Sequence, residues 1–67
     1  MLTIRYSFTD YQYTIAFNEV LIVVGLWDLV SAKETARLLA SLLSDLGQTV
    51  DQIVVKTTGY PDEVIPL

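Results

Sequence analysis

An unbroken apolar run, Val20 to Val24, constrains the fold of this chain more than any other feature. Four of its five residues are β-branched, and such a run is typical of a strand that is buried on both faces. Gly25 ends the run, and helix-start signals follow within a few residues. The run therefore predicts an interior strand, with other strands paired to it and a helix covering it.

The residues before this run alternate between apolar and polar side chains, which predicts two half-buried strands. If Thr9-Asp10 form the loop of a hairpin, apolar residues face apolar residues throughout: Leu2 faces Phe17, Ile4 faces Ile15 and Tyr6 faces Tyr13. A slip by one residue would destroy this match, so the pattern specifies the register. Thr-Asp lacks the glycine that two-residue turns favour, and a longer loop is the alternative.

Asn18-Glu19 is predicted to form a second tight turn, because asparagine tolerates positive φ. That turn would set Phe17 opposite Val20, Ile15 opposite Ile22 and Tyr13 opposite Val24, all on the apolar face shared by the three strands. Leu21 and Val23 would then project from the opposite face, which is polar on the first two strands.

Ser31 and Glu34 fit the S-x-x-E capping box, so a helix is expected from about Ala32 to Leu46, with Gly47 just past its end. Asp28 capping an earlier turn is the alternative. At 100° per residue, a central apolar stripe is flanked by Leu38 and Leu42 on one side and by Ala40 on the other. The central stripe comprises Ala32, Ala36, Leu39, Leu43 and Leu46.

The segment Val50 to Thr57 is predicted to form a fourth strand, parallel to the third after a helical crossover. The spatial order 1-2-3-4 would place the third strand inside the sheet, and 3-2-1-4 is the alternative. Residues 58–67 are expected to form a turn, with Pro61 at its second position, and a short apolar tail. The predicted fold is therefore a single α+β domain, β-β-β-α-β: an antiparallel three-strand meander plus a fourth strand, with one helix on one sheet face.

The chain is unusually apolar for its length, with 67 residues, 52% of them hydrophobic, and a mean hydropathy of +0.47. A domain of this size buries only about 60% of its unfolded surface, so another surface is expected to cover the excess. The longest apolar stretch, Val20 to Trp27, is far shorter than the roughly 20 residues that a membrane span needs. The N-terminal residues alternate instead of forming a signal peptide, so a cytoplasmic protein without a membrane is expected.

Charge and residue types argue against several function classes. The net charge is −4 and the four basic residues are scattered, which disfavours direct nucleic-acid binding. The chain has no cysteine and no histidine, so we expect no disulfide, no metal site, no cofactor and no enzyme activity. Trp27 and Asp28 lie where the third strand meets the helix, an edge at which open sheets often bind ligands. The plainer alternative is that Trp27 covers the core and Asp28 caps the helix.

The prediction of function rests on apolar residues that the predicted core does not use. We expect them to contact another chain, either a partner protein or a second copy in a homodimer. The expected function is a small acidic, non-catalytic interaction module, an inhibitor or adaptor of phage or mobile-element type. The alternative is a homo-oligomeric structural subunit that pairs through the outer sheet face. The candidate partner-binding residues are Leu21, Val23, Leu38, Val54, Tyr60, Val64 and Ile65.

Overall fold

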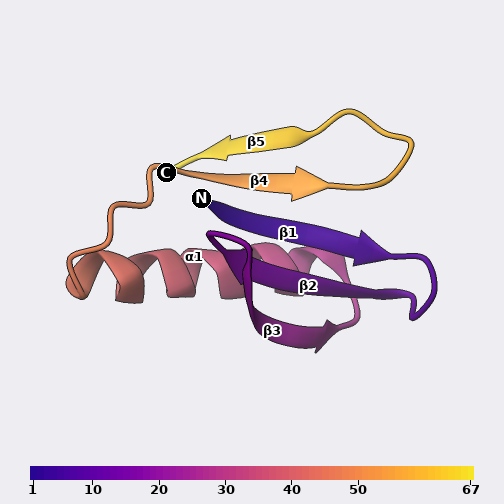
Figure 1. Ribbon diagram of the computed structural model, residues 1–67, viewed down its shortest axis with the longest axis horizontal. Helices are drawn as coiled ribbons and strands as arrows, with labels where there is room; N and C mark the ends of the chain where they lie inside the picture. The colour runs from indigo at the N-terminus through magenta and orange to yellow at the C-terminus, as the bar shows by residue number, and fades with distance from the viewer.

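One sheet of five strands carries one helix on a single face (Figure 1). The structure is a computed structural model that describes all residues, 1–67. The predicted α+β class is confirmed. The elements are β1 (Leu2–Ser7), β2 (Gln12–Phe17), β3 (Val20–Leu26), α1 (Leu29–Asp45), β4 (Gln52–Lys56) and β5 (Glu63–Pro66).

The hairpin of β1 and β2 has the predicted register, with Ile4 opposite Ile15 and Tyr6 opposite Tyr13. Its loop is longer than two residues, because β1 ends at Ser7 and β2 begins at Gln12. The Tyr11 N–H donates to the Ser7 carbonyl over 2.8 Å, and Tyr11 has a φ of 56°. This longer loop needs positive φ only at its last residue, Tyr11, whereas a two-residue type I′ turn needs it at both central residues.

The turn between β2 and β3 is also as predicted, since Asn18 and Glu19 both have positive φ. Beyond it the predicted register is wrong, because two irregularities of the β-bulge type interrupt the pairing of β2 with β3. Each bulge sets two residues of β3 opposite one residue of β2. Ile15 therefore lies opposite Val23 instead of Ile22, and Val23 packs against the core.

The strand order is β3-β2-β1-β4-β5, which matches the alternative order and not the favoured one. β1 is central and runs parallel to β4, with Leu2 opposite Ile53. β3 is an edge strand, and most of its side chains are exposed. The apolar character of Val20–Val24 is therefore not explained by burial within this chain.

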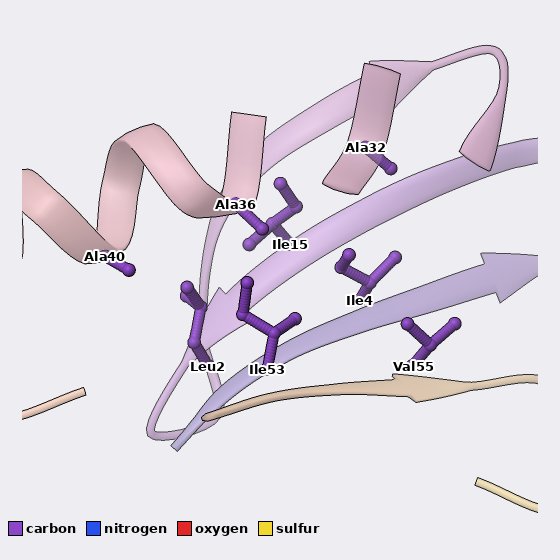
Figure 2. Close-up of a cluster of buried hydrophobic side chains, with 8 residues drawn as sticks. All are labelled: Leu2, Ile4, Ile15, Ala32, Ala36, Ala40, Ile53 and Val55. Carbon is purple, nitrogen blue, oxygen red and sulfur yellow. The ribbon is translucent and has the colours of Figure 1, made fainter. Parts of the chain in front are cut away.

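The core lies between the helix and the middle of the sheet (Figure 2). Figure 2 shows three alanine side chains of α1 turned toward leucine, isoleucine and valine side chains of β1, β2 and β4. Alanines four residues apart let the helix approach the sheet closely, because no long side chain lies between them. The buried cluster comprises Leu2, Ile4, Ile15, Ala32, Ala36, Ala40, Ile53 and Val55.

The alanine contact rotates the helix away from the predicted orientation. Leu39 and Leu43 are partly buried against the core, as the predicted stripe requires. Leu46, predicted to lie in that stripe, is instead 77% exposed. Leu38 and Leu42 are 69% and 58% exposed. The close approach of the small residues thus leaves three leucines, spaced four residues apart, on one flank of the helix.

The predicted tail forms a fifth strand, in which Val64 pairs with Val54 and Ile65 with Ile53. The turn before it is closed by the Tyr60 N–H, which donates to the Thr57 carbonyl over 3.0 Å. Its third residue is Gly59, with a φ of 85°, so the turn lies earlier in the chain than the one predicted around Pro61. A glycine at this position favours that turn, because other residues rarely adopt positive φ.

Candidate interaction surfaces

Asp28 is the N-cap of α1, so the helix begins earlier than the capping box of Ser31 predicted. The Asp28 carboxylate accepts a hydrogen bond from the Ser31 N–H over 2.6 Å. This bond, followed by one from the Ser31 hydroxyl, holds the pKa of Asp28 below its ordinary value. Trp27 is 73% exposed and does not cover the core. Neither residue lines any of the three surface hollows.

The cap predicts a pH dependence of stability. A lowered folded-state pKa stabilises the fold at pH values above the unfolded-state value of 3.8, and this stabilisation is lost as the pH falls toward the folded-state pKa. Asp28→Asn keeps a capping oxygen but does not titrate, which makes it the matched control. In urea unfolding, the wild type should lose stability relative to Asp28→Asn as the pH drops below 3.8. Parallel pH profiles for the two proteins would contradict this role of the carboxylate.

The outer face of the sheet, opposite the helix, is more polar than predicted. Arg5 and Lys56 lie side by side there, because β1 and β4 are parallel and pair these two residues. They line a hollow of about 310 Å³, and the Lys56 ammonium also lies 3.5 Å from the Asp62 carboxylate. Two of the four basic residues of the chain thus lie on the face that was predicted to be polar on the first two strands and apolar at Leu21, Val23 and Val54. The hollow is further lined by Met1, Thr3, Thr14, Ala16, Asn18, Glu19 and Leu21.

Three of the predicted partner-binding residues are buried or partly buried within the single chain. Val23 packs against the core because of the bulges in β3. Ile65 packs there too, because β5 joins the sheet beside β4. Val54 is buried between its strand neighbours Thr3 and Val64.

The remaining predicted residues are exposed but do not form one site. Leu21 lies on β3, Leu38 on α1, Tyr60 in the loop before β5, and Val64 on β5. The sequence prediction therefore identified exposed apolar residues but not the surface to which they belong.

Further exposed apolar residues lie on β3 and on the helix. The strand residues were predicted to lie in the core, and the bulges and the edge position expose them instead. The helix residues, Leu38, Leu42 and Leu46, are here called the leucine flank. The signal that could have revealed this flank is the four-residue spacing of Ala32, Ala36 and Ala40. The two sets are here called together the β3–α1 surface, which comprises Val20, Ile22, Val24, Leu38, Leu42 and Leu46.

The leucine flank lies on the side of the helix away from β5. On the opposite flank, the Lys33 ammonium lies 2.8 Å from the Glu63 carboxylate of β5. At 3.6 residues per turn, the three leucines lie between about 140° and 220° around the helix from Lys33. Figure 1 shows that α1 begins beside the end of β3 and runs back past its start. The leucine flank belongs to the second half of α1, which includes the part that runs past the start of β3.

The structure contains no cluster of three or more metal-ligating side chains. The chain has no histidine and no cysteine, and no three acidic side chains converge on a point that could hold a metal ion. The one helix does not have the length and apolar character needed to cross a membrane. Comparison with protein-family models, with curated proteins and with solved structures found no match.

Proposed function

We propose that this protein is a non-catalytic protein–protein interaction module that acts through its β3–α1 surface. The observation that supports the proposal is the exposure of Ile22 and Val24 on β3 and of the leucine flank on α1. So many large apolar side chains exposed on a small protein favour an interaction site, because leaving them in water is unfavourable. The net charge of −4 keeps the rest of the surface hydrated.

An inhibitor or adaptor, of the kind that phages and mobile elements encode, is the role that fits such a surface. It would act by occupying an apolar surface on a partner protein, and the exposed leucines would supply the buried anchors. The absence of cysteine is compatible with a cytoplasmic setting. A homo-oligomeric subunit is the second candidate, and the open edge of β3 favours it.

The double substitution Leu38→Gln and Leu42→Gln tests the proposed surface. Both leucines are mostly exposed, so their replacement should change stability by no more than about 0.5 kcal/mol each. Capture of the partner that co-purifies from the native host should fall at least about tenfold, as expected when anchor residues are removed. The measurement is quantitative co-purification, with circular dichroism confirming the fold.

The matched control is the double substitution Ser41→Gln and Ser44→Gln, which alters exposed residues of the same helix outside the leucine flank. It should leave partner capture unchanged. Equal capture by both double variants would contradict the proposed surface.

A further inference from the structure

Two cations stand side by side on the outer face of the sheet. Arg5 of β1 and Lys56 of β4 are partners in the parallel pairing of these strands, so their side chains project on the same face. Like charges at such neighbouring positions repel each other. The Asp62 carboxylate lies 3.5 Å from the Lys56 ammonium, but Arg5 has no acidic partner within the chain. The pair therefore carries one positive charge that the chain itself does not balance.

Hydroxyl groups flank the guanidinium of Arg5. Thr14 lies directly opposite Arg5 on β2, and Thr3 lies two residues before Arg5 on β1, so all three belong to one face. Thr3 is only 6% exposed, lines the hollow of about 310 Å³, and makes no side-chain hydrogen bond within the chain. Its hydroxyl oxygen is open to the hollow, since no buried side-chain polar atom is left without a partner. The guanidinium and this hydroxyl thus offer hydrogen-bond donors to one hollow.

A carboxylate is the group that these donors fit. The planar guanidinium presents paired N–H donors that match the two oxygens of a carboxylate, and the Lys56 ammonium adds a second positive charge. The next part of the hollow is apolar, because Ala16 and Leu21, which are partners across β2 and β3, line it. Thr14 and Ala16 are two residues apart on β2, a separation of about 7 Å. A short aliphatic chain covers that distance.

We propose that the outer-face hollow binds a small monocarboxylate that carries a short aliphatic tail. Arg5 and Lys56 hold the carboxylate, and the tail lies along Ala16. Glu19 lines the same hollow and repels a second anionic group, so a monocarboxylate is favoured over a dicarboxylate. The site goes beyond the proposed interaction function and is independent of it, because none of the residues that line the hollow belongs to the β3–α1 surface.

Hexanoate is the probe, and the backbone amide chemical shifts of the full, isotope-labelled chain are the readout. At constant ionic strength, hexanoate should cause saturable shifts centred on Thr3, Arg5 and Ala16. Hexylammonium has a similar tail and the opposite charge, so it should cause no saturable shift at these residues. Inorganic phosphate has negative charge but no tail, so it should bind more weakly than hexanoate.

Arg5→Gln should weaken hexanoate binding at least about tenfold, because it removes charge-assisted hydrogen bonds to the carboxylate. Arg37→Gln is the matched control, since Arg37 is an exposed arginine on α1 and its replacement changes the net charge by the same amount. It should leave hexanoate binding unchanged.

Several results would overturn the inference. Equal losses in Arg5→Gln and Arg37→Gln would show that only the net charge of the protein attracts the anion. Shifts centred on the leucine flank would place the tail of hexanoate there, and no saturable shift would show that the hollow binds no carboxylate. Phosphate that binds as tightly as hexanoate would exclude a role for the apolar part of the hollow. The double substitution Leu38→Gln and Leu42→Gln should leave hexanoate binding unchanged, so this proposal and the proposed function can fail separately.

Discussion

Ile15→Asp is expected to abolish folding. Ile15 is fully buried in the middle of β2, where it faces the alanines of the helix (Figure 2). An unpaired charge left in such a place costs about 3–5 kcal/mol. A single core in a domain of this size rarely supplies more than about 3–5 kcal/mol. The cost therefore matches the whole stability of the chain, and the far-ultraviolet circular dichroism spectrum should be that of an unfolded protein.

Thr14→Asp is the matched control for this substitution. Thr14 is the neighbouring residue on the same strand, but it belongs to the outer face and lies opposite Arg5. The new carboxylate would remain beside water and near a cation, so the change in stability should stay within about 0.5 kcal/mol. If Thr14→Asp unfolded the protein and Ile15→Asp did not, the two faces of the hairpin would be inverted.

Ala36→Leu should produce the second largest loss of stability. Ala36 is fully buried between the helix and the sheet. A leucine there forces the helix outward or its neighbours out of their rotamers, which costs about 1–3 kcal/mol. Leu42→Ala is the reciprocal change on the exposed flank, and it should cost little because the leucine is 58% exposed. Urea unfolding midpoints of the two variants give the comparison.

The opposite ranking would contradict the orientation of the helix. A buried leucine typically costs about 2–5 kcal/mol when it is replaced by alanine. If Leu42→Ala lost that much and Ala36→Leu were neutral, the leucines would face the sheet. The β3–α1 surface would then not exist, and the proposed function would lose its basis.

The hairpin of β1 and β2 was predictable from the sequence because its two faces differ in chemistry. Ile4 and Ile15 alternate with polar residues such as Arg5 and Thr14, so only one register pairs like with like. The turn at Asn18-Glu19 was predictable for a related reason, since asparagine tolerates the positive φ that the turn requires.

The register and the position of β3 were not predictable in the same way. Every residue from Val20 to Val24 is apolar, so no polar residue marks which face is which, and a bulge leaves no trace in the pattern. The inference from an apolar run to an interior strand assumes that the run is buried within its own chain. In this structure the run lies at an edge, where a second chain would have to supply the burial.

The orientation of the helix depends on side-chain size, which the periodicity of apolar residues in the sequence does not take into account. Alanine and leucine count equally as apolar, so the predicted stripe was broad enough to include Ala40 and Leu38 on opposite flanks. Packing distinguishes them, because alanines permit closer contact with the sheet. That distinction moves Leu42 and Leu46 from the predicted stripe to the candidate interaction surface, where Leu38 was already expected.

Cysteine reactivity tests most directly whether the leucine flank is exposed on the single chain and covered by another chain. The protein has no cysteine, so Leu42→Cys and Ser41→Cys each introduce a unique thiol, one on the flank and one beside it. In dilute solution both thiols should react with a maleimide at similar rates, because both positions are exposed. At high concentration, or with the host partner added, Leu42→Cys should react several-fold more slowly while Ser41→Cys is unchanged. A Leu42→Cys thiol that is already protected in dilute solution, or one that is never protected, would contradict the interaction surface.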